Sequence, residues 1–214
     1  MAQITHRRIT RRTLLLAAAL AAPTAGWAEA GKVVTLLGDS IAAGQGLPEA
    51  AALPAQLRSA LARLGVKVEM RGAGVSGDTT ADGLARAERD VLPDTSVCVV
   101  ELGGNDMLGM VDPREVRANL EKIVVGLQTR RIGVVLAGLS APLELGLAYV
   151  REFDAIFPAL ARAYGTPICS DLLEGVERIS ALNQADGIHP NAKGVRVIAE
   201  HLAPAVARAL RKAG

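Results

Sequence analysis

Short apolar runs alternate along the chain with longer stretches in which apolar residues recur at every third or fourth position. The short runs predict β-strands over residues 33–37, 66–70, 97–102, 132–138 and 167–170. The longer stretches predict helices over residues 51–65, 81–92, 113–130, 148–165 and 191–214, the last of them broken near Pro204. Five strands that alternate with helices predict an α/β fold with a parallel sheet and right-handed crossovers.

Polar and glycine-rich segments follow the predicted strands. They read GDSIAAG after the first strand, RGAGVSGDT after the second, GGNDML after the third and LSAPLELG after the fourth, and NQADGIHPN precedes the last helix. Ligands of parallel α/β sheets bind outside the carboxyl ends of the strands. We therefore expect these segments to form one site at that edge of the sheet.

The chain has 214 residues, half of them apolar, which is enough for one domain with a full-sized core. Its first thirty residues contain four arginines, then the apolar run TLLLAAALAA and the small-residue sequence AEA. This order predicts a cleaved secretory signal peptide over residues 1–30 and a mature domain over residues 31–214, exported to the periplasm or, alternatively, secreted. The sequence TRRTLLL leaves both general secretory and twin-arginine export open.

Removal of the predicted signal changes the charge of the protein. The whole chain has 24 Lys+Arg and 22 Asp+Glu, but residues 1–30 hold four arginines and one glutamate, which leaves 20 basic and 21 acidic residues. No basic patch interleaved with aromatic residues remains, so nucleic acid is disfavoured as a partner. Trp27, the only tryptophan, lies in the predicted signal, so the processed protein should lack tryptophan fluorescence.

His189 is the best candidate for a general base. Of the other two histidines, His6 lies in the predicted signal and His201 lies within a helical pattern, where a partly buried structural histidine is expected. Asp186 precedes His189 by three residues across an Asp-Gly turn, so its carboxylate can hold Nδ1 protonated and leave Nε2 free to accept a proton. The alternative is a turn and helix start that contain a histidine by chance.

Ser40 is the candidate nucleophile. It ends the sequence VVTLLGDS at a predicted strand-to-helix turn, where a serine is exposed at the sheet edge and lies in the positive field of a helix N-terminus. The alternative is that Asp39 or Ser40 simply caps the helix.

The segment ELGGND contributes a candidate for oxyanion stabilisation. Gly103 and Gly104 allow a sharp turn that directs Asn105 over the same edge, and its side-chain amide is a suitable neutral donor. Asp106 can orient this loop. An ordinary Asn-Asp turn is the alternative.

These segments together resemble the SGNH, or GDSL-type, hydrolases over nearly all of the mature chain. LLGDSIAAG resembles the first block of the family, GVSGDTTADGLAR the second, VVELGGND the third and DGIHPNAKG the last. The likeness is strongest to bacterial periplasmic multifunctional esterases of the arylesterase, acyl-CoA thioesterase I and lysophospholipase type. It implies a flavodoxin-like three-layer α/β/α sandwich with a five-stranded parallel sheet in the order 2-1-3-4-5.

The resemblance also implies the roles of individual residues. It makes Ser40 the nucleophile, His189 the base and Asp186 its orienting partner. The oxyanion hole would consist of the Ser40 and Gly77 backbone N–H groups and the Asn105 side chain. The implied reaction is hydrolysis of a carboxylic ester or thioester, of a small molecule or a lipid, through an acyl-enzyme and without a metal or organic cofactor.

The sequence departs from the family pattern after the nucleophile without changing the proposed catalytic set. The family often has Ser or Thr where this chain has Ala42, a difference that bears on acyl-group preference.

The implied strand order separates Cys98 from Cys169, and both lie in apolar strand-like runs. We therefore predict buried free thiols, although an oxidising compartment permits a disulfide.

The stretch RGAGVSGDTT also matches the dinucleotide-binding pattern G-x-G-x-x-G at Gly72, Gly74 and Gly77. Such a fingerprint belongs in the first βα turn, which here reads GDS, so we interpret the match as coincidental. We expect Gly77 to donate to an oxyanion and the other two glycines to shape the loop. Glu101, which stands where a ribose-binding acid would, is expected to be positioned by the turn that follows it.

Two other functions are alternatives on the same fold. One is a carbohydrate O-acetylesterase, and the other is a non-catalytic nucleotide- or flavin-binding module. The first would need an aromatic platform for sugars, but Tyr149, Phe153, Phe157 and Tyr164 follow helical spacing and are expected in the core.

Overall fold

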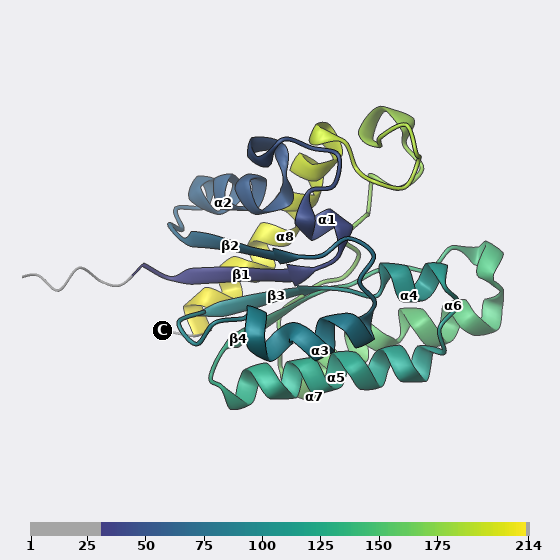
Figure 1. Cartoon of the computed structure of the whole chain (residues 1–214), viewed down its shortest axis with the longest axis horizontal. Helices are drawn as coiled ribbons and strands as arrows, with labels where there is room; N and C mark the ends of the chain where they lie inside the picture. The colour runs from purple at the N-terminus through teal and green to yellow at the C-terminus, as the bar shows by residue number, and fades with distance from the viewer. Residues whose placement is uncertain (1–30, 213–214) are drawn as a thin grey trace, which may run out of the picture. The chain divides into compact units, whose positions relative to one another are not determined.

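The computed structural model describes residues 31–212, so the predicted signal peptide over residues 1–30 lies outside the described residues. Five parallel strands form one sheet in the order β2-β1-β3-β4-β5, which confirms the implied topology (Figure 1). The strands are β1 (Val33–Gly38), β2 (Glu69–Gly74), β3 (Val97–Glu101), β4 (Gly133–Ala137) and β5 (Ile168–Cys169). Gly38 pairs with Gly74 of β2 and with Glu101 of β3, so the carboxyl ends of these three strands are level.

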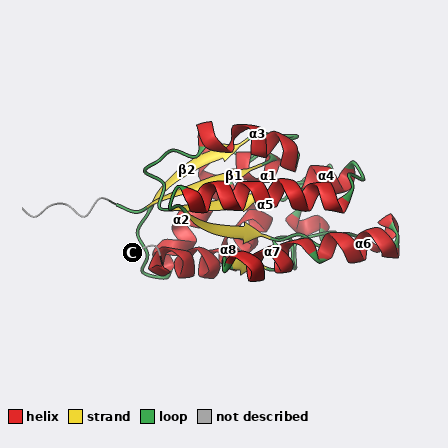
Figure 2. Cartoon of the chain, turned by 90° about the horizontal axis from the view of Figure 1, so that it is seen from below, coloured by secondary structure: helices red, strands yellow, loops and turns green. Residues whose placement is uncertain are grey.

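Helices cover both faces of the sheet and make three layers. On one face, α2 (Leu53–Arg63) packs against α8 (Ala192–Lys212). The other face is covered by α3 (Thr80–Asp90), α5 (Pro113–Thr129) and α7 (Ile156–Tyr164), as Figures 1 and 2 show. Three shorter helices are α1 (Ser40–Ala43), α4 (Gly104–Leu108) and α6 (Leu147–Asp154), and single 3₁₀ turns lie at Glu49–Ala51, Leu143–Leu145 and Ser180–Leu182.

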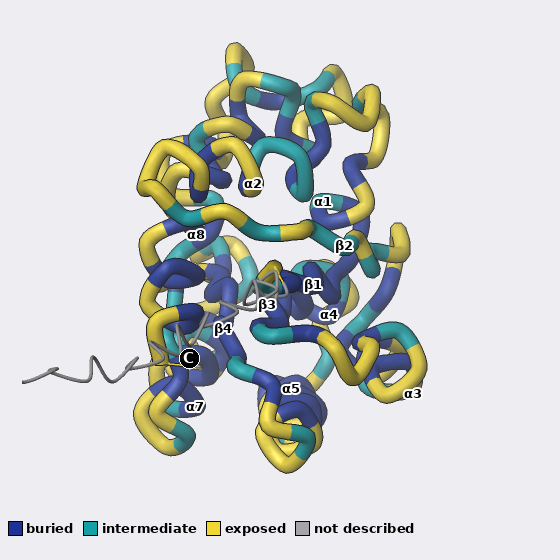
Figure 3. The backbone as a smooth tube through the Cα atoms, turned by 90° about the vertical axis from the view of Figure 1, so that its left-hand side faces the viewer, coloured by how far each residue is buried: buried dark blue, intermediate teal, exposed yellow. Residues whose placement is uncertain are grey.

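The central strands form the middle of the hydrophobic core. Every residue of β1 and β3 is buried, as expected for parallel strands that are covered on both faces. Figure 3 shows buried segments along these strands and exposed segments on the outer helix faces and loops. By contrast, β2 lies at the edge of the sheet and none of its residues is fully buried.

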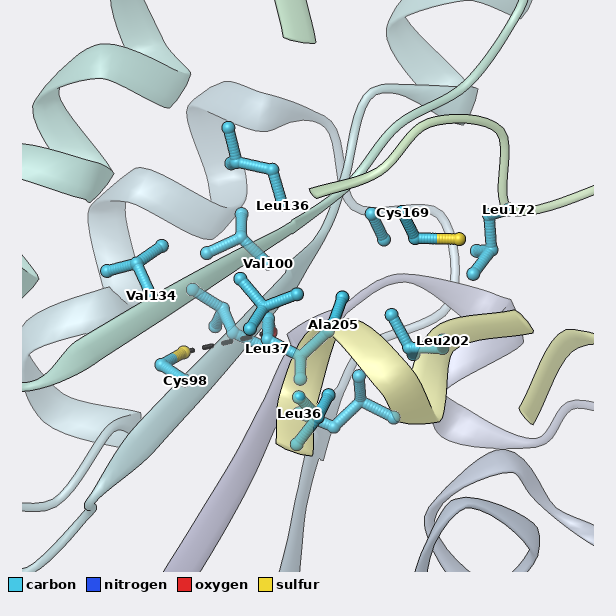
Figure 4. Close-up of a cluster of buried hydrophobic side chains, with 14 of the residues drawn as sticks. Leu36, Leu37, Cys98, Val100, Val134, Leu136, Cys169, Leu172, Leu202 and Ala205 are labelled. Carbon is cyan, nitrogen blue, oxygen red and sulfur yellow. Dashed lines mark hydrogen bonds between the residues drawn. The ribbon is translucent and has the colours of Figure 1, made fainter. Parts of the chain in front are cut away.

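Cys98 and Cys169 are both free and buried, as predicted. Figure 4 shows the two sulfur atoms on different sides of a cluster that includes Val100, Leu136 and Leu202. Burial raises the pKa of the Cys98 thiol to about 12 and that of Cys169 to about 11. Both side chains therefore behave as small apolar groups in the core.

The predicted position of the second strand was wrong. The apolar run predicted residues 66–70, but β2 extends over Glu69–Gly74 because its register is set by pairing with β1. Gly72 and Gly74 consequently lie inside the strand, and they do not shape a loop after it. A Cβ on Gly74 would lie 2.3 Å from Ala43 N, so this glycine lets α1 approach the strand.

Two helix predictions were also wrong. The helix predicted over residues 148–165 is divided into α6 and α7, because Pro158 cannot donate to Asp154 and its ring would meet the Asp154 carbonyl in a continuous helix. In contrast, α8 continues through Pro204, which is exposed, so that the carbonyl left without a donor can face water. His201, expected to be partly buried, is also exposed.

The aromatic residues belong to the core, as predicted. Phe153 and Phe157 are fully buried, and Tyr149 and Tyr164 are partly buried against the same core. Phe153 stacks on Tyr149 and packs edge-on against Phe157.

Candidate active site

Ser40 lies at the carboxyl edge of the sheet, where β1 passes directly into α1. The Asp39 side chain caps this helix, with Oδ1 accepting a hydrogen bond from Ile41 N at 3.0 Å. Gly44 ends the helix after a single turn in the left-handed conformation, at φ 72°. The short helix thus fixes the backbone on both sides of Ser40, and the serine remains 9% exposed.

His189 and Asp186 approach Ser40 from the other end of the chain. His189 Nε2 lies 2.9 Å from Ser40 Oγ, and His189 Nδ1 lies 2.7 Å from Asp186 Oδ2. Both residues come from the loop over residues 184–191, which we call the 184–191 loop. Its ends are tied by a hydrogen bond from Gln184 N to His189 O, and Gln184 Nε2 also donates to Gln45 O in the loop after α1.

The conformation of this loop comes from Asp186. Its Oδ1 accepts hydrogen bonds from the backbone N–H groups of Ile188 and His189, each at 3.0 Å, while Gly187 takes φ 72°. The hydrogen bond from the His189 ring, followed by these two backbone bonds, lowers the pKa of Asp186 to about 2. A carboxylate at this position favours the His189 tautomer with its proton on Nδ1.

Asn105 reaches the same edge from α4. Gly103 precedes this helix with φ 119°, a conformation that strongly favours glycine, and thereby turns the chain sharply after β3. Asn105 Nδ2 donates to Asp39 Oδ2 at 3.2 Å and to Asp78 O at 2.9 Å. These bonds place the amide between the residue before Ser40 and the residue after Gly77.

Gly77 is exposed and adopts φ 88° in the segment between β2 and α3. Among residues 31–212, no acceptor takes a hydrogen bond from the backbone N–H of Gly77 or of Ser40. The structure therefore brings Ser40, Gly77, Asn105, Asp186 and His189 to one edge, and both backbone donors remain free for a ligand.

Arg86 supports this edge and was missed in the sequence analysis. Although it lies within a helix, its guanidinium group is buried and binds Asp78 Oδ2 at 2.5 Å, Gly38 O at 2.8 Å and Ala73 O at 2.8 Å. One side chain of α3 thus joins the ends of β1 and β2 to the segment that carries Gly77. Its spacing in the helical pattern marked it only as a polar position, so no local signal indicated these contacts.

Glu101 is also part of the site, but the prediction that the turn after β3 positions it was wrong, because its side chain binds the turn after β1. It is 1% exposed, and its Oε2 accepts hydrogen bonds from Asp39 N and Ala42 N, each at 3.2 Å. Burial raises the pKa of Glu101 well above its ordinary value, and the neighbouring charge of Asp39 raises it further. Burial also raises the pKa of Asp39.

Asp106 orients the loop after β3, as expected. Its two carboxylate oxygens accept hydrogen bonds from Thr80 N at 2.8 Å and Thr80 Oγ1 at 2.6 Å. Asn119 of α5 donates to the same hydroxyl at 3.2 Å. Asp106 thereby links the start of α3, and hence the segment after Gly77, to the helix that carries Asn105.

The site is open to solvent. The enclosed space beside Ser40 and His189 amounts to about 10 Å³, whereas a cavity of about 480 Å³ lies next to Ala42 and Ala43, between α1, α2 and β2. Large exposed apolar side chains at this end of the sheet include Val75 after β2, Leu108 and Met110 after β3, Leu143 and Leu147 after β4, and Ile188 in the 184–191 loop. No helix within residues 31–212 is both long and apolar enough to cross a membrane.

Comparison with known proteins gives consistent matches. Residues 36–197 match the model of the GDSL-like Lipase/Acylhydrolase family. Esterase TesA of Pseudomonas aeruginosa is 34% identical over 180 residues, which cover 84% of this chain and 90% of TesA. Thioesterase 1/protease 1/lysophospholipase L1 of Escherichia coli K12 is 33% identical, with coverage of 82% and 84%. The crystal structure of AlinE4, an SGNH-hydrolase family esterase, is 43% identical with a TM-score of 0.70, covering 84% of this chain and 97% of AlinE4.

Proposed function

The chain belongs to the GDSL-like lipase/acylhydrolase family and is a hydrolase of ester bonds, and we propose that Ser40, His189 and Asp186 carry out the reaction. The observation that carries this proposal is the continuous series of contacts from Ser40 Oγ to His189 Nε2 at 2.9 Å and from His189 Nδ1 to Asp186 Oδ2 at 2.7 Å. Nucleophile, base and orienting carboxylate are thus within hydrogen-bond distance in the order that acyl transfer requires.

In the proposed mechanism, His189 Nε2 accepts the Ser40 hydroxyl proton while Oγ attacks the carbonyl carbon of the ester. The tetrahedral intermediate collapses when the carbon–oxygen or carbon–sulfur bond breaks, and the imidazolium gives its proton to the leaving alcohol or thiol. Water then attacks the acyl-enzyme by the same steps and restores Ser40. Asp186 stabilises the imidazolium and holds the ring in position.

The negative charge on the former carbonyl oxygen needs donors at the same edge. We assign this role to the backbone N–H groups of Ser40 and Gly77 and to Asn105 Nδ2. The two backbone groups have no other acceptor within residues 31–212, and the contact from Asn105 to Asp39 Oδ2 is its longer one, at 3.2 Å. The amide can therefore turn toward an oxyanion while it keeps its bond to Asp78 O.

For the substrate, we propose aryl esters, lysophospholipids and acyl thioesters of coenzyme A. The names of the relatives include an esterase and a thioesterase/lysophospholipase. The exposed side chains of Leu108, Met110, Leu143 and Leu147 supply apolar surface for an acyl chain at the open edge. Phe153 and Phe157 are in the core, so they offer no platform for a sugar, and the carbohydrate O-acetylesterase alternative gains no support.

We further propose that the protein is exported and acts in the periplasm. The support is the order of basic, apolar and small residues over residues 1–30. Cell fractionation and N-terminal sequencing of the mature protein test this proposal, and a mature chain that still contains Trp27 would contradict it.

Replacement of Ser40 by Ala tests the assignment of the nucleophile. Hydrolysis of p-nitrophenyl esters of increasing acyl length, acyl-CoAs and lysophospholipids should fall to background in Ser40→Ala, and labelling with a fluorophosphonate probe should disappear. Circular dichroism should be unchanged. Ser59→Ala, on the exposed face of α2, is the matched control and should behave as the wild type. Retained turnover in Ser40→Ala would contradict the assignment.

A further inference from the structure

Two acidic side chains that the proposed reaction does not use lie beneath the turn that carries Ser40. Asp39 is 4% exposed and Glu101 is 1% exposed. Gly38 pairs with Glu101 across β1 and β3, and a Cβ on Gly38 would lie 2.4 Å from Glu101 Oε2. A glycine at this position therefore provides the space through which the Glu101 side chain reaches the turn.

Glu101 and Asp39 connect this turn to the oxyanion donor. Glu101 Oε2 accepts hydrogen bonds from Asp39 N and Ala42 N, on either side of Ser40. Asp39 Oδ1 accepts from Ile41 N, and Asp39 Oδ2 accepts from Asn105 Nδ2. The position of Asn105 thus depends on Asp39, and the backbone at Asp39 depends on Glu101.

The two carboxyl groups are buried at the same turn, where Glu101 Oε2 lies 3.2 Å from Asp39 N, and within residues 31–212 neither forms an ion pair with a basic side chain. Two ionised carboxylates without a cationic partner would place a charge of −2 in this buried turn, which is costly, whereas one bound proton removes half of that charge. Burial and their mutual repulsion both favour retention of that proton. The other charged or titratable groups around the pair are His189 from the 184–191 loop and Arg86 from α3, which is itself paired with Asp78 and donates to Gly38 O.

We propose that Asp39 and Glu101 share a single proton and that Glu101 is a positioning residue for the Ser40 turn and for Asn105. The catalytic part of this inference rests on the proposed function. The shared proton keeps the charge of the pair at −1, whereas a charge of −2 beside Asn105 would oppose the oxyanion that forms there.

The pH dependence of stability tests the shared proton without any reference to activity. Glutamine at position 101 can accept the two backbone bonds through Oε1 and donate to Asp39 through Nε2, so Glu101→Gln mimics the protonated glutamic acid. In the wild type, the stability due to the bound proton is fully present below the ordinary Glu pKa of 4.5 and is lost as the pH rises toward the higher pKa of the folded state. Glu101→Gln has no such loss.

The unfolding equilibrium should therefore separate the two proteins. Relative to Glu101→Gln, the folding constant of the wild type should fall about tenfold per pH unit above about pH 5, as one proton requires. Chemical denaturation at about pH 5, 6 and 7 measures this difference. Glu88→Gln, on the exposed face of α3, is the control, and its folding constant should change with pH in the same way as that of the wild type. If the folding constants of Glu101→Gln and the wild type change equally with pH, or if Glu101→Gln does not fold, the shared proton is overturned.

Activity tests the positioning role. Glu101→Gln should keep kcat/KM within about threefold of the wild type, because its amide reproduces all the bonds. Glu101→Ala leaves two buried N–H groups without their acceptor, so its kcat should fall about tenfold or more with a smaller change in KM. A well-folded Glu101→Gln that loses a hundredfold in kcat, or an active Glu101→Ala, would overturn this role. If the wild type hydrolyses no ester, the proposed function fails, and the stability curves still decide the shared proton.

Discussion

The 184–191 loop and the buried polar groups beneath Ser40 are built in opposite ways. In the loop, the side chains of Asp186 and His189 are 43% and 17% exposed, and their mutual contact spans three residues of sequence. Beneath Ser40, we define the buried polar network as Asp39, Asp78, Arg86, Glu101 and Asp106, all of which are 9% exposed or less. Its contacts join distant segments, such as Asn105 to Asp39 and Arg86 to Gly38.

This difference separates the residues that perform the reaction from the residues that support the site. Exposed charge pairs contribute little to stability because water already solvates both partners. A buried charge that loses its partner is strongly destabilising, because it is neither solvated nor paired. Changes in the 184–191 loop should thus affect the reaction and leave the fold intact, whereas changes in the buried polar network should affect both.

His189→Ala should give the largest effect on activity with almost none on stability. Without a base, kcat/KM should fall by about 10⁴-fold or more, as is typical for loss of a triad member. Because the side chain is partly exposed and its loop is held by Asp186 and Gln184 through backbone bonds, the midpoint of denaturation should change little. Steady-state kinetics and urea denaturation on the same preparation measure both quantities, and a strongly destabilised variant would contradict the comparison.

Arg86→Met should give the largest effect on stability. It leaves Asp78 buried without its partner and removes the bonds to Gly38 O and Ala73 O, so the free energy of unfolding should fall by about 3–5 kcal/mol. Activity should fall as well, since the segment with Gly77 loses its support.

Arg89→Met provides a matched control for this prediction. Arg89 lies on the same helix and pairs with Asp90, but its side chain is 76% exposed, so we expect a change below about 1 kcal/mol. Equal destabilisation by the two variants would contradict the distinction between buried and exposed charge pairs.

The same contrast explains what could be predicted from the sequence. Asp186 and His189 lie three residues apart across a turn, and Ser40 and Asn105 directly follow buried strands, so local pattern and the parallel topology were enough to bring them to one edge. The strand order came from the family resemblance and was confirmed, because alternation alone leaves several orders open.

The support of the site could not be predicted in this way. Arg86 occupies an ordinary polar position of a helical pattern, and nothing in the neighbouring sequence indicates that it faces inward toward Gly38. The shifted position of β2 has a similar cause, since its register depends on β1 and the local apolar run Val66–Met70 does not determine it. Both features are fixed by contacts between segments that are distant in sequence.

Asn105→Ala should have an intermediate effect, because this residue joins the two regions. Loss of one oxyanion donor should reduce kcat by about 10²–10³-fold with a small change in KM. Asn105→Asp keeps the size of the side chain but removes both donors and adds a charge beside Asp39, so its kcat should be at least as low. Activity of either variant within threefold of the wild type would exclude Asn105 from the oxyanion hole.

Asp186→Asn should have only a small effect on stability, which is present above about pH 4 and disappears in acid. The pKa of Asp186 is lowered to about 2 from 3.8, so its contribution to stability is fully present above pH 3.8 and is lost as the pH falls through about 2. Asparagine has no such dependence, so wild type and variant should converge in acid. The loop is solvated, which keeps the difference small.

The stability of His189→Ala should lie between that of the wild type and that of Asp186→Asn, because Asp186 then loses the ring but keeps its bonds from the backbone N–H groups of residues 188 and 189. Denaturation between about pH 5 and pH 2 measures the free energy of unfolding of the three proteins. A wild type that gains stability relative to Asp186→Asn as the pH falls would show that the Asp186 carboxylate does not stabilise the loop.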